Sequence, residues 1–175
     1  MQLKPQDVVL AFVLALDGAR FSRSYQGLAD FLGMSASEIH AGVRRLKLSA
    51  LWSNESLEGR VDTKRLGNFC IYGLPVWLPG KIGQPTIGFA TGESSECLSK
   101  QLTGGEHTLV WPSPSGNVRG LEFPPIHGSC AQLAKLSTAS AEVLKVVDGL
   151  RSGSARVRRV SESELRKVFA ERRMK

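Results

Sequence analysis

The chain of 175 residues is long enough for one hydrophobic core, or for a small domain with a second lobe. Its hydrophobic share of 42% and charged share of 22% exclude a collagen-like or broadly disordered protein. The formal net charge of +7 favours a polyanionic partner, which includes DNA, RNA and a membrane surface. Residues 151–175 carry nine Lys and Arg against three Asp and Glu, so +6 of this charge lies in the C-terminal segment.

Three cysteines, Cys70, Cys97 and Cys130, are widely spaced and odd in number, and no secretion signal precedes them. This pattern predicts reduced thiols in a protein of the cytoplasm. No apolar run approaches the roughly 18–20 residues that a membrane helix needs, so we expect no membrane partner.

The chain opens with an apolar segment that predicts a helix over Met1 to Leu16, with Pro5 in its first turn. Residues 8–16 contain almost no polar side chain. We therefore expect this helix either in the centre of the core or at a dimer interface.

Two further helices are predicted around a glycine turn. The first covers Tyr25 to Leu32 and is capped by Ser22 or Ser24, and Gly33 suits a left-handed residue at its end. Ser35 and Glu38 form a capping box that starts a third helix, which runs to about Ser49. Its core-facing residues are expected to be Ile39, Val43 and Leu46.

These two helices have the residues that a helix-turn-helix requires. A small residue lies midway along the first helix, a glycine and an apolar residue form the turn, and a branched core residue lies in the second helix: Ala29, Gly33, Met34 and Ile39. The second helix would then enter the major groove of DNA. The alternative is a plain helical hairpin whose arginines are merely solvated. The predicted DNA-binding residues are Ser35, Ser37, His40, Ala41, Arg44, Arg45 and Lys47.

A second set of residues could contact phosphates. It consists of Arg23, Tyr25, Arg60, Lys64, Arg156, Arg158 and Arg159. For the basic C-terminal helix, two other interpretations are open. It can be a solvated helix face, or its apolar stripe can bind a second subunit or an acidic partner protein.

Residues 28–52 resemble the winged helix-turn-helix of the MarR-type regulators, which follows the pattern LAxxLGxSxSxVxxxVxxLxxxGLI. Ala50 stands where that family usually has glycine, and a basic wing with an arginine tip is not evident. Further along, residues 68–73, Trp111-Pro112 and residues 118–120 resemble bacterial proteins of about this length that are usually labelled MarR-like. The resemblance implies a bacterial transcription regulator, and pairing with a toxin or defence gene is an alternative that it leaves open.

Beyond Trp52 we expect a stunted wing that turns at Glu58-Gly59, followed by a fourth helix that ends at Gly73. Residues 74–130 contain all the prolines except Pro5 and predict an irregular region. Its short strands are expected at Thr86–Ala90, Thr108–Trp111 and Val118–Phe123, with residues 115–117 as a hairpin turn. A short helix is expected over residues 93–102, before a loop at Gly104-Gly105. Trp77 and Trp111 would hold this region against the helical core.

The C-terminal part predicts helices over Ser137 to Leu150 and over Ala155 to Arg173, with a hinge at residues 152–154. The expected fold is mainly α, with three regions. Residues 1–73 form a winged-helix-like DNA-binding domain, residues 74–136 an irregular lid with short strands, and residues 137–175 the C-terminal helices with the basic tail.

No motif of catalysis occurs, so we predict no enzyme, no catalytic residue and no cofactor. His127 and Cys130, with Cys97 and His107, have a weakly ligand-like spacing, but no CxxC pair accompanies them and we predict no metal site.

The sequence therefore favours a cytoplasmic, sequence-specific regulator that binds double-stranded DNA, most simply a repressor acting as a homodimer. One recognition helix contacts too few base pairs for useful specificity, which is why a dimer is expected. The alternative function is a protein-binding antitoxin or adaptor whose partner is encoded nearby. RNA or ribosome association through the basic tail is a third hypothesis.

Overall fold

The computed structural model describes residues 2–18, 24–54, 57–102, 107–152 and 154–173. It is mainly helical, with a small three-stranded sheet, as the sequence predicts. The helices are α1 (Pro5–Leu16), α2 (Tyr25–Leu32), α3 (Ala36–Leu48), α4 (Thr63–Asn68), α5 (Leu74–Trp77), α6 (Glu96–Ser99), α7 (Ser129–Lys135), α8 (Ala139–Arg151) and α9 (Ala155–Arg173). A π-helical turn, η1 (Phe69–Gly73), joins α4 to α5, and a 3₁₀ turn, η2 (Gly92–Ser94), precedes α6. The strands are β1 (Pro85–Ala90), β2 (Leu109–Pro112) and β3 (Val118–Glu122).

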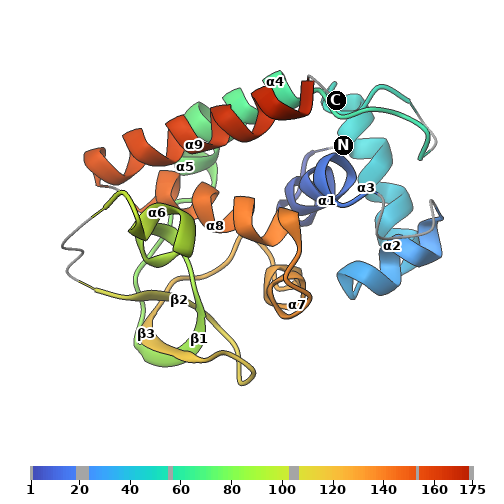
Figure 1. The fold of residues 1–175 in the computed structure, drawn as a ribbon. Helices are drawn as coiled ribbons and strands as arrows, with labels where there is room; N and C mark the ends of the chain where they lie inside the picture. The colour runs from blue at the N-terminus through green and yellow to red at the C-terminus, as the bar shows by residue number, and fades with distance from the viewer. Residues whose placement is uncertain (1, 19–23, 55–56, 103–106, 153, 174–175) are drawn as a thin grey trace.

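The helices and the sheet occupy different parts of the molecule. In Figure 1, α1 and α8 lie in the middle, α9 and α4 run along the top, and α2 and α3 lie at the right. The three strands lie at the lower left, and α7 lies below α8. One hydrophobic core contains residues from α1, α3, α8 and α9, so the helices before Gly73 and the two C-terminal helices pack as one body.

Helix α1 lies in the centre of this core. Its residues from Val8 to Val13 are no more than 1% exposed. Asp17, directly after the helix, accepts hydrogen bonds from the backbone N–H groups of Ala139 and Ser140 (3.2 and 2.8 Å) and from the Ser140 hydroxyl. The end of α1 thus binds the first turn of α8. Since α1 is buried within the chain, the expectation that it forms a dimer interface is wrong for its apolar residues.

In the described residues between α3 and α4, the strand pairing consists of one isolated bridge. Trp52 and Val61 form an isolated antiparallel bridge, and two backbone hydrogen bonds flank it (Ser53 N–H to Arg60 O and Asp62 N–H to Leu51 O, both 3.0 Å). Residues 55–56 lie outside the described part of the chain. The described strand pairing here is therefore as short as the sequence predicts.

The fourth helix does not end at Gly73 as predicted. It continues through η1 and α5 to Trp77, because Gly73 keeps a right-handed helical conformation and the fixed φ of Pro75 is compatible with a helix. Its buried apolar side chains, Leu66, Cys70 and Leu74, recur every four positions. In an ideal α-helix a spacing of four drifts by about 40° per step, and the wider π turn offsets this drift.

The three short strands occur close to their predicted positions and form a small closed barrel. β1 pairs antiparallel with both neighbours, but β2 and β3 pair parallel through Leu109 with Leu121 and Val110 with Glu122. The predicted hairpin turn over residues 115–117 is therefore wrong, since parallel strands cannot be joined by a hairpin. Gly116 instead packs on β1, where a Cβ would lie 2.2 Å from the backbone of Gly88.

A buried carboxylate, Asp148 of α8, connects the barrel to the helices. It accepts hydrogen bonds from the Trp111 indole (2.5 Å) and the Thr91 hydroxyl (2.8 Å), and it pairs with Arg151 (2.5 Å). Burial raises the pKa of Asp148, while Arg151 and the two other donors act in the opposite direction. Arg151 also donates to the backbone carbonyl of Leu78 (2.8 Å). The prediction that Trp111 holds the lid on the core is confirmed.

Other features of the middle region differ from the prediction. Helix α7 was not predicted, because its seven residues begin after a glycine that supplies no side-chain cap. In place of the single helix expected over residues 93–102, the structure has the 3₁₀ turn η2 followed by the short helix α6. Gly104-Gly105 and Gly153 lie outside the described residues. Among the described residues, no helix is long and apolar enough to cross a membrane.

Candidate nucleic-acid interface

The turn between α2 and α3 is built as the sequence predicts. Ser24 caps α2 by accepting a hydrogen bond from Gly27 N–H (2.9 Å), and Gly33 adopts a left-handed conformation with φ of 65°. Ser35 then caps α3 by accepting from Glu38 N–H (3.2 Å), and Glu38 accepts from Ser35 N–H (3.0 Å). The capping box satisfies both donors and determines where α3 begins.

The capping box also makes Glu38 a measurable reporter of this turn. Hydrogen bonds from the backbone and then the hydroxyl of Ser35 lower the pKa of Glu38. An acid whose pKa is lower in the folded state stabilises the fold above its unfolded pKa, and this contribution is lost as the pH falls through the folded pKa. We expect an NMR titration to give Glu38 a pKa below the ordinary glutamate value. Ser35→Ala removes the hydroxyl and keeps the backbone N–H, so the pKa should rise part of the way toward that value, and an unchanged pKa would contradict the hydrogen bond from the hydroxyl.

The inner face of α3 packs against α1. Ile39, Val43 and Leu46 are fully buried, as predicted. Gly42 is also buried, and a Cβ there would lie 2.9 Å from Leu10 Cδ2 and 3.0 Å from an Asp7 carboxylate oxygen. Glycine at this position therefore allows α3 to approach α1 closely.

Arg45 does not face solvent, contrary to the prediction. Its side chain is only 7% exposed, and its Nε and Nη2 donate to the two carboxylate oxygens of Asp7, both at 2.6 Å. Asp7 also accepts from the backbone N–H of Lys4 at the start of α1 (2.7 Å). Arg45 follows Gly42 by three residues, so helical periodicity places it on the same side of α3, beside α1. This pair determines how α3 is rotated about its axis, and Arg45 is removed from the candidate DNA contacts.

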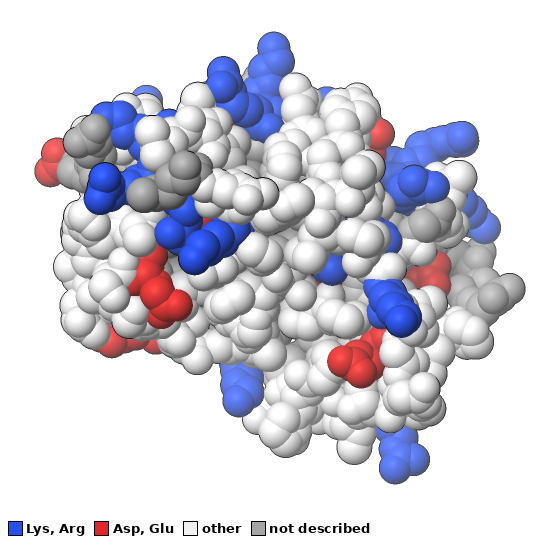
Figure 2. Space-filling model, turned by 180° about the vertical axis from the view of Figure 1, so that it is seen from behind, with Lys and Arg blue, Asp and Glu red and all other residues white. Residues whose placement is uncertain are grey.

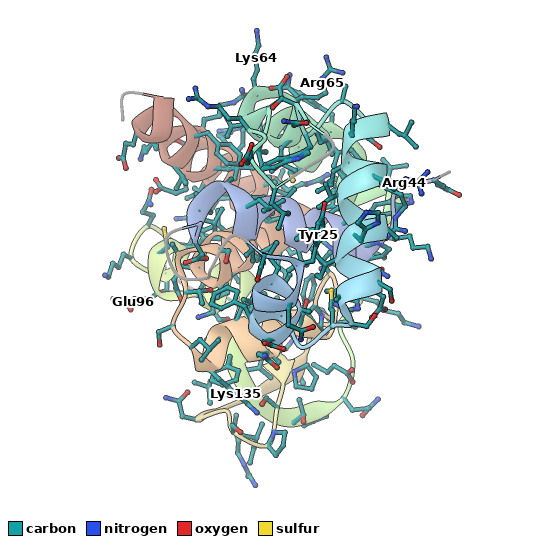
Figure 3. The ribbon with its side chains drawn as sticks, turned by 90° about the vertical axis from the view of Figure 1, so that its right-hand side faces the viewer. Tyr25, Arg44, Lys64, Arg65, Glu96 and Lys135 are labelled. Carbon is teal, nitrogen blue, oxygen red and sulfur yellow. The ribbon has the colours of Figure 1, made fainter. Side chains whose placement is uncertain are left out.

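The outer face of α3 carries the other predicted residues. Ser37, His40, Arg44 and Lys47 are exposed, and Ala41 is half-buried. Their spacing of three and four places them on one side of the helix. Figure 3 shows Arg44 projecting outward from α3, and its guanidinium makes no ion pair with any described residue. Ser35 and Ser37 lie at the helix N-terminus, their hydroxyls 3.1 Å apart.

Several predicted phosphate contacts lie around α3. The ring of Tyr25 lies against that of His40, with centroids 5.0 Å apart. Arg60 and Lys64 are exposed and follow the C-terminal end of α3 in the chain. Figure 3 shows Lys64 at the top of the molecule together with Arg65, which was not predicted as a contact and pairs with Asp62 (3.6 Å). Seen from behind, most of the basic side chains lie in the upper half of the molecule (Figure 2).

The remaining predicted contacts are not brought to this surface. Arg156, Arg158 and Arg159 are exposed in the first turns of α9, at the end of the molecule opposite α3 (Figure 1). Arg23 lies outside the described residues. The structure thus separates the basic residues into one group near α3 and α4 and a second at the start of α9.

Helix α7 supports the turn from behind. The amide of Gln132 donates to the backbone carbonyls of Asp30 and Phe31 at the end of α2 (3.1 and 3.2 Å). A Cβ at Gly33 would lie 2.7 Å from the Gln132 amide oxygen, so only glycine fits here without displacing that side chain. Sequence reasoning missed Gln132, because nothing local links it to residues one hundred positions earlier. It missed Asp7 as a partner of Arg45 for the same reason.

The cysteines and histidines form no metal site among the described residues. Cys70, Cys97 and Cys130 are free thiols. Burial raises the pKa of Cys130 to about 12, and burial likewise raises the pKa of Cys70. His127 contacts the Ser129 hydroxyl through Nδ1 (2.9 Å), and burial lowers its pKa.

Comparisons with protein-family models, curated proteins and solved structures find no match to this chain. The functional assignment therefore depends on the geometry of α2, α3 and their surroundings.

Proposed function

We propose that the protein is a sequence-specific transcription regulator of the cytoplasm that binds duplex DNA with α2 and α3 as a helix-turn-helix. The observation that supports this proposal is the exposed row of Ser37, His40, Arg44 and Lys47 on α3. The opposite face of the same helix is held on α1 by a buried ion pair. The helix is thus fixed on one side and presents polar and basic groups on the other.

The chemistry of this row suits a major groove. The groove is about 12 Å wide and admits an α-helix, and arginine is the residue that most often reads guanine through O6 and N7. We assign Arg44 this role, with His40 and Ala41 beside it. Ser35 and Ser37 lie at the helix N-terminus, where backbone N–H groups favour a phosphate. Arg60 and Lys64 extend the basic surface beyond the other end of α3.

In this proposal the segment after α3 serves as a very short wing. The bridge between Trp52 and Val61 is the only described strand pairing in that position. A short wing supplies few contacts of its own, so Arg60 and Lys64 are assigned to the phosphate backbone. A repressor acting as a homodimer is part of the proposal, because two recognition helices read two half-sites about one helical turn apart.

Selection of bound duplexes from a random DNA pool tests this function. We expect enrichment of a palindromic site, and the enriched duplex should compete better than RNA of the same sequence for the protein. Affinity should fall steeply as salt rises, since phosphate contacts release counterions. Absence of enrichment, or stronger competition by RNA, would reject the proposed function.

A further inference from the structure

Two backbone carbonyls at the end of α2 receive their hydrogen bonds from another helix. The carbonyls of Asp30 and Phe31 lie in the last turn of α2, where the helix itself supplies no further N–H donors. The side-chain amide of Gln132, in α7, donates to both of them (3.1 and 3.2 Å). Gly33 follows in its left-handed conformation, directly against the same amide. The turn between α2 and α3 therefore depends on where α7 holds Gln132.

The first turn of α7 is held largely by His127, which precedes the helix by two residues. The backbone N–H of Ser129 donates to the imidazole at Nδ1 (3.3 Å), and the N–H of Cys130 donates to the His127 carbonyl (3.0 Å). The Ser129 hydroxyl also lies 2.9 Å from Nδ1. Gly128, at the N-cap, supplies no side-chain cap. The imidazole thus takes the part of a capping side chain, and Nδ1 accepts the backbone hydrogen bond only while it carries no proton.

Protonation of this imidazole acts against the first turn of α7. An N–H at Nδ1 faces the N–H of Ser129, so the backbone donor loses its acceptor even where the Ser129 hydroxyl turns to accept from the ring. The positive charge also lies at a helix N-terminus, where the helix dipole favours negative groups. Burial lowers the pKa of His127, so the fold favours the neutral ring. Stability from this source is therefore lost as the pH falls from the unfolded toward the folded pKa.

Two carboxylates of neighbouring helices lie within electrostatic reach of the ring. Glu38 of α3 and Asp7 of α1 both raise the pKa of His127, but by less than burial lowers it. Asp7 is already paired with Arg45, whereas Glu38 is the acid of the capping box that begins α3. An imidazolium at this place attracts Glu38 and competes with its hydrogen bonds from Ser35. The charge state of His127 therefore acts on the end of α2 through α7 and on the start of α3 directly.

We infer that His127 is a proton-sensitive positioning residue: protonation of its ring loosens the first turn of α7, displaces Gln132 from the end of α2 and weakens the binding of duplex DNA by α3. The consequence for DNA rests on the proposed function. The coupling of His127 to Gln132 rests on contacts within the free chain. The effect of a cation at a helix N-terminus corresponds to a loss of affinity of about two- to fivefold.

NMR of the free chain tests the coupling between about pH 8 and about pH 5, the range in which histidines titrate. We expect the side-chain amide signals of Gln132 to move with the same midpoint as the ring protons of His127. In His127→Asn, the new side chain still accepts from the N–H two residues on but has no titrating group, so the Gln132 signals should stay constant. The matched control is His107→Asn, an exposed histidine before β2, in which the Gln132 signals should titrate as in the parent.

Duplex affinity, measured on the same samples, tests the consequence for DNA. The ratio of the parent's affinity to that of His127→Asn removes the contribution of His40, which both proteins carry on α3. This ratio should fall about two- to fivefold as the pH drops through the midpoint of His127. Gln132 signals that stay constant in the parent, or that move equally in His127→Asn, overturn the inference, as does a ratio that is independent of pH. If the Gln132 signals titrate as expected while the parent binds no duplex at any pH, the coupling stands and the DNA-binding proposal fails.

Discussion

Replacing Arg44 by alanine is expected to weaken binding of the enriched duplex by about 5- to 150-fold, the loss of roughly 1–3 kcal/mol typical of a base-contacting arginine. The side chain is exposed and pairs with no described residue, so the melting temperature should stay within about 2 °C of the parent. Fluorescence anisotropy with a labelled duplex measures the effect. Arg119→Ala is the matched control, because Arg119 is an exposed arginine of β3, far from α3.

The same variant distinguishes base reading from phosphate contact. If Arg44 reads a guanine, the variant should tolerate other bases at one position of the half-site. If it contacts only phosphate, binding should weaken for all sequences and the salt slope should fall by about one. A variant that binds as tightly as the parent at every salt concentration would show that α3 does not read DNA through Arg44.

The largest effect on stability is expected at the buried pair of Asp7 and Arg45. Arg45→Met removes the guanidinium and leaves the Asp7 carboxylate buried, which typically costs about 3–5 kcal/mol. For a chain of this size each kcal/mol lowers the melting temperature by about 2–4 °C, so we expect a fall of roughly 6–20 °C. Thermal unfolding followed by circular dichroism measures this fall.

A double variant provides the control for this prediction. Asp7→Asn keeps an acceptor for the Lys4 N–H but removes the charge that Arg45 neutralises. In Asp7→Asn/Arg45→Met no charge is left unpaired, so the double variant should be more stable than Arg45→Met alone. If the loss of stability in the double variant equals the sum of the losses in the two single variants, Asp7 and Arg45 do not act as a coupled ion pair.

The sequence predicts the local features well because the signals for them are local. Ser24, Gly33 and the pair of Ser35 and Glu38 determine the ends of α2 and α3 through caps within four residues. The bounds of α2 and α9 also agree with the prediction. For α9 the local signal is the break in the helical pattern that precedes Ala155 in the sequence. The candidate surface on α3 follows from these ends and from helical periodicity.

Features that depend on distant contacts could not be predicted in this way. Arg45 looks solvated in the sequence, because its partner Asp7 is 38 residues away. The parallel pairing of β2 and β3 and the position of Gln132 against α2 likewise arise only when distant segments meet. These errors concern the partner of a residue, whereas α7 is an element that the sequence misses because the glycine at its N-cap supplies no side-chain cap.

The separation of basic residues also changes the interpretation of the charge. The sequence concentrates charge in the last 25 residues, yet α9 begins at the end of the molecule opposite α3 (Figure 1). We therefore assign the contacts to a single duplex half-site to α3, Arg60 and Lys64. The basic residues in the first turns of α9 then contribute to attraction at a distance, which salt screens over about 8–10 Å.

The most direct test of the account is to map the duplex on the protein by NMR chemical shifts. We predict that titration with the enriched duplex shifts the backbone signals of Ser37, His40 and Arg44 most strongly, with smaller shifts at Arg60 and Lys64. Signals of Arg156, Arg158 and Arg159 should change little at the same stoichiometry. Shifts confined to the start of α9, with α3 unchanged, would contradict the assignment of α3 as the DNA-reading helix.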